Sequence, residues 1–323
     1  MRSKILAMLQ NAGSEYISGE EIANRLGVSR TAVWKHIREL REAGYDIRSH
    51  SRSGYMLREA PDLLLPDEVR HGLKTKSIGQ NIVYYDDIPS TNTEAKRLAA
   101  EGAPEGTVVV SEAQSTGRGR MERKFFSPKG KGIWFSVLLR PDFLPQEAPK
   151  CTLLAAVAVA KAMEQFGLQA GIKWPNDILY DGRKLVGILT EMHAEMDRIN
   201  YVVIGTGINV NIQSEEFPSE IRDCATSLAI MKGEKIPRAA FFRAVLQALE
   251  ELYTVVKEQG FAPLMDEWRH YTITLGQEVN VLGINETFSG KALDIDADGA
   301  LLVETAQGVH RVVAGDVSIR PRK

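Results

Sequence analysis

A glycine-rich basic segment, QSTGRGRMERKFFSP (114–128), is the part of the sequence best suited to chemistry. Its glycines allow the backbone to approach a ligand closely, and its cations can neutralise an anion. The cations are Arg118, Arg120, Arg123 and Lys124. The segment therefore predicts an anion-binding loop. A flexible basic surface loop would have the same composition, so the interpretation depends on partners elsewhere in the chain.

Three further motifs could complete an anion site. KWPND (173–177) offers a cation, an aromatic ring, a turn-forming proline, an amide and a carboxylate at the end of a predicted strand. Lys184 stands at the start of the next predicted strand, within DGRKLVGIL (181–189). GTGINVN (205–211) places glycines inside an apolar strand, which indicates a bulge or a ligand close to the backbone.

A fourth motif, STN (90–92), stands at the mouth of a predicted helix. Its hydroxyl and amide groups could bind a polar ligand. Ser90 or Thr91 could equally be only the N-cap of that helix.

The elements that must position these motifs mix strands and helices irregularly. Strands are expected at 81–88, 106–114, 132–140, 171–180, 184–193 and 200–212. Helices are expected at 90–102, 148–167 and 238–260. This order favours an α+β fold with a mixed or antiparallel sheet. After Leu275, short strands broken by turns at 283–286, 296–299 and 306–308 predict a small all-β barrel.

The first 60 residues have the pattern of a winged helix-turn-helix. Apolar side chains recur at helical spacing in both helices, in the second at Val33, Trp34, Ile37 and Leu40. Of these, Val33, Ile37 and Leu40 are expected to pack the second helix inward. Gly27 can supply the left-handed turn between the helices, and Ser29 can cap the second one. The residues expected to contact DNA are Ser29, Arg30, Thr31, Lys35 and His36 from that helix and Arg52 from the wing. A helical hairpin used for protein contact is the alternative.

Composition sets the outer limits. The 323 residues allow two or three domains, which we place at 1–60, 75–268 and 272–323. Residues 1–60 hold ten Lys and Arg against seven Asp and Glu, whereas the remainder holds thirty against thirty-five, so DNA contact is expected in the first part. The two cysteines form no disulfide framework, and the longest apolar run is too short for a bilayer. We therefore expect a soluble protein of the reducing cytoplasm with no membrane partner.

Taken in order, STN, GRGR, KWPND, RKLVGIL and GTGINVN resemble the motifs of biotin–protein ligases. With its helix-turn-helix the chain resembles the bifunctional class, whose members also repress biotin operons. The resemblance covers essentially the whole chain. It implies a central mixed-sheet domain of the biotin/lipoate-ligase type and an SH3-like C-terminal barrel.

The resemblance also implies a two-step reaction. Biotin and MgATP would give biotinoyl-5′-AMP and pyrophosphate, and a lysine of a biotin carboxyl carrier domain would then displace AMP. Biotinoyl-5′-AMP would act as corepressor by promoting a homodimer that binds the operator DNA of biotin genes.

Site residues follow from the same match, with Lys184 and Arg118 as the catalytic pair. Biotin contacts are expected from Ser90, Thr91, Asn92, Gln114, Gly117, Arg118, Gly119, Arg120 and Lys184. ATP contacts are expected from Arg120, Arg123, Lys173, Asn176 and Asn209. Asp177 would help to hold Mg²⁺.

Two positions depart from the family pattern or leave it open. Phe125 stands where members often have tryptophan, and Phe217 is the only aromatic between Asn211 and Ala225 that could cover an adenine. Trp134 could line the biotin tail or be a plain core residue. The competing interpretations are a lipoate or octanoate ligase or transferase, a ligand-sensing repressor that has lost catalysis, and a ligase that binds no DNA and uses its N-terminal block only for domain interaction.

Overall fold

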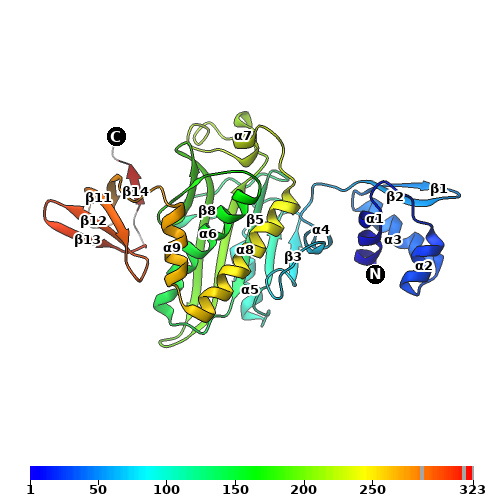
Figure 1. Ribbon diagram of the computed structural model, residues 1–323, viewed down its shortest axis with the longest axis horizontal. Coiled ribbons are helices and arrows are strands. Elements are labelled where there is room, and N and C mark those ends of the chain that lie inside the picture. The colour runs from blue at the N-terminus through cyan, green and yellow to red at the C-terminus, as the bar shows by residue number, and fades with distance from the viewer. Residues whose placement is uncertain (284–286, 315–317, 322–323) are drawn as a thin grey trace. The chain divides into compact units, whose positions relative to one another are not determined.

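The computed structural model describes residues 1–283, 287–314 and 318–321. The chain divides into two compact units, Met1–His71 and Gly72–Lys323. Figure 1 shows the elements of both.

The N-terminal unit is a winged helix-turn-helix. Its elements are α1 (Arg2–Asn11), α2 (Gly19–Leu26), α3 (Arg30–Glu42), β1 (Asp46–His50), β2 (Gly54–Glu59) and α4 (Pro66–Arg70). Gly27 ends α2 with a left-handed φ of 66°. The Ser29 hydroxyl accepts a hydrogen bond from the backbone N–H of Ala32 at 3.2 Å and so caps α3. The turn and the cap predicted from the sequence are confirmed.

A mixed sheet forms the centre of the second unit. Within the described residues it has seven strands, in the order β3-β4-β5-β9-β8-β7-β6. They are β3 (Ile82–Tyr85), β4 (Val108–Ser111), β5 (Gly132–Leu139), β6 (Gly171–Lys173), β7 (Asp177–Tyr180), β8 (Arg183–Ala194) and β9 (Ile199–Asn209). Strands β3 and β4 are parallel, and the other neighbours are antiparallel. The predicted α+β class with a mixed sheet is confirmed.

Helices cover both faces of this sheet. The helices of this unit are α5 (Thr91–Ala100), α6 (Cys151–Gln165), α7 (Leu228–Lys232), α8 (Arg238–Gln259) and α9 (Ala262–Tyr271), with short 3-10 turns at Arg120–Glu122, Pro145–Lys150 and Ser214–Glu216. On β5, Leu138 packs in one cluster with Ala95 and Ala99 of α5. The neighbouring Phe135 instead meets Phe242 of α8, with ring centroids 4.8 Å apart. Side chains alternate along a strand, so α5 and α8 lie on opposite faces.

The C-terminal part is a small antiparallel sheet. In the described chain its order is β13-β12-β11-β10-β14. The strands are β10 (Glu278–Leu282), β11 (Thr287–Ile295), β12 (Leu301–Thr305), β13 (Gly308–Val312) and β14 (Ser318–Pro321). The predicted turns at 296–299 and 306–308 are present. Of the predicted turn at 283–286, residues 284–286 lie outside the described residues.

Two features differ from the sequence-based expectations. The strand expected at 171–180 is two strands, β6 and β7, because a turn at 174–176 separates them. The helices α4, α7 and α9 were not predicted. Val33, Ile37 and Leu40 of α3 are buried, as expected, and Trp34 beside them is 51% exposed. Among the residues that the structure describes, no helix has both the length and the apolar character to cross a membrane.

Glu250 of α8 ties the start of the second unit to the helix. Its carboxylate accepts backbone hydrogen bonds from Lys76 at 2.6 Å, Ser77 at 2.7 Å and Ile78 at 2.8 Å. Burial alone would raise the pKa of Glu250, but these hydrogen bonds outweigh it and hold the pKa below its usual value.

We predict that Glu250→Gln lowers the free energy of unfolding by about 1–3 kcal/mol at neutral pH, because an amide cannot accept all these donors. A carboxyl with a lowered folded-state pKa stabilises above its unfolded pKa and loses that contribution as the pH falls through the folded value. The difference between wild type and variant in urea denaturation should therefore shrink below about pH 4. Glu251→Gln, at an exposed neighbour, is the control. An equal effect of both substitutions would contradict the prediction.

Candidate functional site

A cavity of about 310 Å³ opens where the start of α5, the 114–128 segment and strands β7, β8 and β9 meet. Its lining contains every residue predicted to bind biotin, ATP or Mg²⁺ except Gly117. Gly117 is buried beside the cavity, and a Cβ there would lie 2.4 Å from the carbonyl oxygen of Phe125. The five motifs, distant in sequence, therefore share one place in the fold.

Polar side chains at the start of α5 form a buried network on the cavity wall. The Thr91 N–H donates to Oε1 of Gln114 at 2.9 Å, and Nε2 of Gln114 donates to the Ser127 hydroxyl at 3.0 Å. The Ser136 hydroxyl on β5 donates to Oδ1 of Asn92 at 2.6 Å. These bonds fix the orientation of both amides. Ser127 and Ser136 were not predicted.

Ser90 is the N-cap of α5 and also lines the cavity. Its hydroxyl accepts from the N–H of Thr93 at 3.5 Å as the N-cap of α5. It also lines the cavity while only 4% exposed. Capping is therefore compatible with contact to a ligand.

Glu191 on β8 is a site residue that sequence reasoning missed. Its carboxylate accepts from Nδ2 of Asn92 at 2.9 Å, pairs with Nζ of Lys96 at 2.7 Å and lies 4.0 Å from Nη1 of Arg118. Burial would raise the pKa of Glu191, but Lys96, Asn92 and Arg118 together lower it below its usual value. Glu191 therefore places negative charge near Arg118, whose side chain is about half exposed. Strand alternation from Gly187 and Leu189 could have found it.

The basic loop is folded as a small hairpin. The Gly119 N–H donates to the Arg123 carbonyl at 2.7 Å, and the Phe125 N–H donates to the Gly117 carbonyl at 2.8 Å. Met121 closes the tip with a left-handed φ of 54°. The arrangement leaves the side chains of Arg118 and Arg123 exposed beside the cavity.

Phe125 packs against a floor made of glycines. A Cβ at Gly207 would lie 2.5 Å from its ring, and a Cβ at Gly187 would lie 2.7 Å from it. The ring also meets Trp134 edge-on, with centroids 5.9 Å apart, and Nζ of Lys184 lies 5.7 Å from its centroid. The glycines of GTGINVN and RKLVGIL are thus used for close packing in the cavity floor.

The KWPND turn contacts one cation of the basic loop, Arg120, and one cation of β8, Lys184. Nη1 of Arg120 donates to Oδ1 of Asn176 at 3.0 Å, and Nδ2 of Asn176 donates to the Ile188 carbonyl at 2.9 Å. Lys184 Nζ pairs with Oδ1 of Asp177 at 2.6 Å. Both cations therefore hold their positions through the same turn.

The remaining aromatic predictions divide between cavity and core. Phe217 is buried, lines the cavity and lies 6.3 Å from the ring of Phe126. Trp134 is fully buried, and its indole N–H donates to the Pro128 carbonyl at 3.3 Å. It is not among the lining residues described, which supports the plain core interpretation. Asn209 lines the cavity and donates to the Thr226 carbonyl at 3.0 Å.

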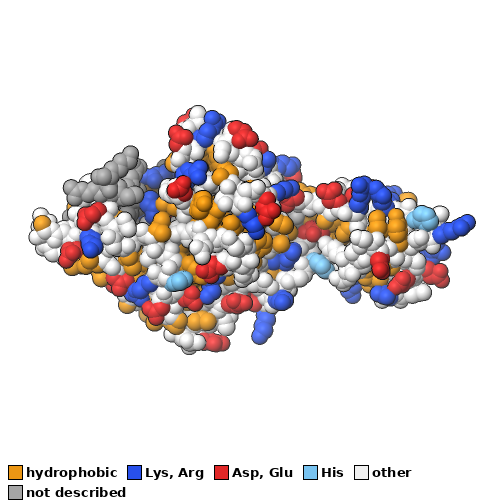
Figure 2. Space-filling model, turned by 45° about the horizontal axis from the view of Figure 1, so that its top comes forward, with side chains coloured by type: hydrophobic (Ala, Val, Ile, Leu, Met, Phe, Trp, Pro, Cys, Tyr) orange, Lys and Arg blue, Asp and Glu red, His pale blue; other side chains and the backbone are white. Residues whose placement is uncertain are grey.

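The predicted DNA-reading residues lie on the surface of the N-terminal unit, where Figure 2 shows Lys and Arg side chains among acidic ones. Those that are exposed are Ser29, Arg30, Thr31, Lys35 and Arg52. His36 is half-buried at the edge of this face, and its Nδ1 lies 2.8 Å from Glu39. Trp34 is exposed beside them, with the Arg38 guanidinium 5.3 Å from its ring.

Comparison with known proteins supports three parts of the chain. Residues 84–209 match the biotin/lipoate A/B protein ligase family, residues 2–56 an HTH domain and residues 274–320 the biotin protein ligase C-terminal domain. The bifunctional ligase/repressor BirA of Bacillus spizizenii is 48% identical over 320 residues, which cover 99% of this chain and 98% of that protein. This chain belongs to the bifunctional biotin ligase/repressor family.

More distant relatives agree with this membership. The bifunctional ligase/repressor BirA of Escherichia coli is 30% identical over 98% of this chain and 96% of its own length. Biotin protein ligase from Aquifex aeolicus, solved in complex with biotin and ATP, superposes with a TM-score of 0.67 at 30% identity. It covers 75% of this chain and 100% of its own. The predicted ligase activity and the predicted repressor function are confirmed at the level of the family.

Gly205 is packed so closely against Asn92 that a larger side chain would not fit. A Cβ there would lie 1.9 Å from Oδ1 of Asn92. We predict that Gly205→Ala costs about 1–3 kcal/mol of unfolding free energy through overpacking. Asn92→Ala should relieve that clash. The double variant should therefore lose clearly less unfolding free energy than the sum of the losses in the two single variants. Urea denaturation of the four proteins measures this, and strict additivity would contradict the steric account.

Proposed function

We propose that the cavity catalyses both steps of biotin transfer to protein. Biotin carboxylate would attack the α-phosphorus of ATP, forming biotinoyl-5′-AMP with release of pyrophosphate. A lysine amine of a biotin carboxyl carrier domain would then attack the mixed anhydride and release AMP. The observation that carries the proposal is the convergence of Arg118, Arg120 and Lys184 on one cavity beside a network of neutral polar groups.

The cations answer the main physical difficulty of the first step. A carboxylate and a polyphosphate repel each other, so fixed positive charge must bring them together and stabilise charge that develops on the phosphate oxygens. No side-chain nucleophile is required, because positioning and charge stabilisation provide most of the rate enhancement. We assign Lys184 and Arg118 to this role. Lys184 would exchange part of its contact with Asp177 for the reacting oxygens.

The polar network favours biotin over lipoate. A ureido ring has N–H donors and a carbonyl acceptor, which match the amides of Asn92 and Gln114 and the hydroxyls of Ser90 and Thr91. The dithiolane ring of lipoate offers no such partners, so these buried groups would lose hydrogen bonds to water without replacement. We therefore assign the STN motif and Gln114 to the biotin head group, with Gly117, Gly119 and the loop closing over it.

The nucleotide would lie on the other side of the cavity. We assign its contacts to Arg120, Arg123, Lys173, Asn176 and Asn209. Phe217, at the wall of the cavity, is the candidate to cover the adenine.

The donor set also fits Mg²⁺ carried in with ATP. Within the described residues no group of three His, Cys, Asp or Glu side chains forms a dedicated metal cage. Mg²⁺ usually retains waters and binds through one or two carboxylates together with substrate phosphates. Asp177 is the carboxylate that would hold it, and the metal would neutralise phosphate charge.

Division of labour would follow the three segments expected from the sequence, with DNA reading at 1–60, catalysis at 75–268 and a supporting domain at 272–323. We propose a cytoplasmic location, because the substrate ATP and operator DNA occur there.

Biotinoyl-5′-AMP would order the 114–128 loop and the 211–227 segment together, since Phe126 and Phe217 already connect them. Their ordering would favour a homodimer that binds an operator with two-fold symmetry.

Exchange of labelled pyrophosphate into ATP tests the catalytic proposal. Wild type should exchange with biotin and not with lipoate. Lys184→Ala should lower kcat/KM for exchange by about 100- to 1,000-fold, because a cation at the reacting oxygens is lost. Its non-specific DNA affinity should be unchanged. Lys257→Ala on α8, which pairs with Glu105 at 3.3 Å, is the control, and near-normal exchange by Lys184→Ala would refute the assigned role.

Sedimentation tests the regulatory proposal. We predict that biotin plus ATP tightens self-association at least tenfold, whereas either ligand alone has a smaller effect, because only the adenylate contacts both segments. Lys184→Ala should not respond to the two ligands. If the wild type self-associates equally with and without biotin plus ATP, the proposed link between adenylation and repression is wrong.

A further inference from the structure

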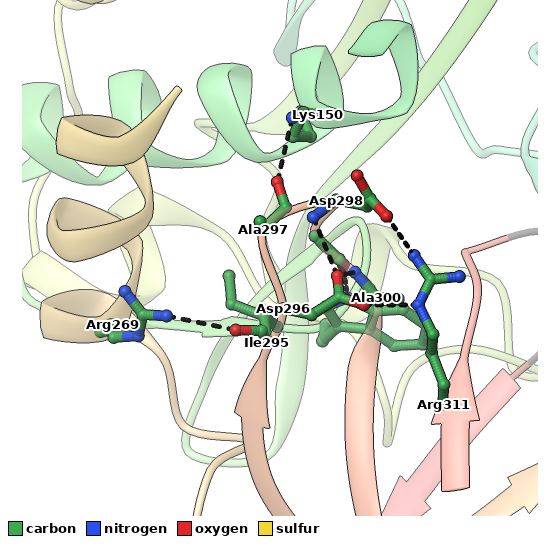
Figure 3. A network of polar contacts seen from close by, with 10 residues as sticks. Lys150, Arg269, Ile295, Asp296, Ala297, Asp298, Ala300 and Arg311 are labelled. Carbon is green, nitrogen blue, oxygen red and sulfur yellow. Dashed lines mark hydrogen bonds and ion pairs between the residues drawn. The ribbon is translucent and has the colours of Figure 1, made fainter. Parts of the chain in front are cut away.

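One turn of the C-terminal sheet receives donors from three elements of the catalytic part. Lys150 Nζ donates to the Ala297 carbonyl at 3.0 Å, and Arg269 Nη2 of α9 donates to the Ile295 carbonyl at 3.1 Å (Figure 3). The indole N–H of Trp174 donates to the Gly299 carbonyl at 3.0 Å. Carbonyls of alternate residues along 295–299 thus face the catalytic part. We call this segment the bracing turn.

The bracing turn is itself held in shape. Oδ1 of Asp296 accepts from the N–H of Asp298 at 2.9 Å and of Ala300 at 3.0 Å. Arg311 of β13 bonds the carboxylates of both Asp296 and Asp298, as Figure 3 shows. Gly299 has a φ of +79°, and a Cβ there would lie 3.1 Å from Leu153. The position of the Gly299 carbonyl is therefore fixed from both sides.

Trp174 contacts the bracing turn and is also one of the residues that line the cavity. Its side chain is 1% exposed, and its backbone N–H donates to the Thr274 hydroxyl at 2.9 Å. Two residues further on, Asn176 holds Arg120, and Asp177 then holds Lys184. The KWPND turn is thus fastened at Trp174 to the C-terminal part and presents its next polar residues to the proposed reaction site.

We infer that Trp174 is a positioning residue through which the bracing turn sets the KWPND turn for nucleotide binding. The inference rests on the proposed adenylation function. If Trp174 is released, Asn176 and Asp177 lose their fixed distance to Arg120 and Lys184. The nucleotide side of the cavity should then weaken while the biotin side, built on α5 and β5, is unaffected.

Trp174→Phe tests this by removing the indole N–H while keeping an aromatic ring. We expect KM for ATP in pyrophosphate exchange to rise about tenfold, with the dissociation constant for biotin within twofold of wild type by calorimetry. Amide hydrogen exchange at 176–178 should become faster. A matched control is Trp268→Phe, because Trp268 of α9 is also fully buried but its indole N–H has no hydrogen-bond partner within the described chain.

The same contact can be tested from the other side. Gly299→Ala should strain the bracing turn and push it from Leu153, and we expect a similar rise in KM for ATP. In the double variant with Trp174→Phe, the increase should be far smaller than the product of the two single effects, because both act on one hydrogen bond.

The outcomes separate the inference from the proposed function. If Trp174→Phe and Trp268→Phe change KM for ATP and amide exchange equally, the positioning role is wrong even though wild type is active. If wild type shows no biotin-dependent exchange of pyrophosphate, the proposed function fails. Amide exchange at 176–178 still decides whether the bracing turn fixes the KWPND turn.

Discussion

Repulsion between cations is the constraint on which the site depends. Three of the cations that line the cavity have an acceptor nearby: Glu191, which also pairs with Lys96, lies 4.0 Å from Arg118, Asn176 lies 3.0 Å from Arg120 and Asp177 lies 2.6 Å from Lys184. The lining also contains Arg123, Lys124 and Lys173, whereas Asp177 is the one Asp or Glu among the lining residues described, so the cavity wall carries more positive than negative charge. This local excess of positive charge would attract phosphates even though the net charge of the protein is −2.

The register of two strands supplies both the acceptors and the room for a ligand. Gly187 on β8 lies directly opposite Gly207 on β9, and Leu189 lies opposite Gly205. This pairing gathers glycines on the face where Phe125 and Asn92 pack. A slip of one residue would turn Glu191 to the other face and remove the acceptor for Arg118. Strand register, fixed by the core on the far face, therefore controls the charge arrangement.

Local interactions explain which parts could be predicted from sequence. The cap at Ser29 and the left-handed turn at Gly27 depend on residues within three or four positions, so they can be recognised in the chain itself. The motif residues were found because their types are unusual for strands and turns. The inner face of α3 was predicted correctly, because Val33, Ile37 and Leu40 repeat at spacings of four and three residues and are buried.

The missed residues depend on contacts far apart in sequence. Ser136 and Glu191 meet Asn92 across 44 and 99 positions, and Gly299 meets Trp174 across 125. Alternation along β8 from Gly187 and Leu189 recovers Glu191, and the pairing of Ser136 with the cavity residue Gly205 recovers Ser136 once the register is known. No such periodicity leads to Gly299, because its carbonyl belongs to a turn of a separate sheet. The arrangement of the nucleotide side therefore depends on packing between the two sheets, which a motif cannot encode.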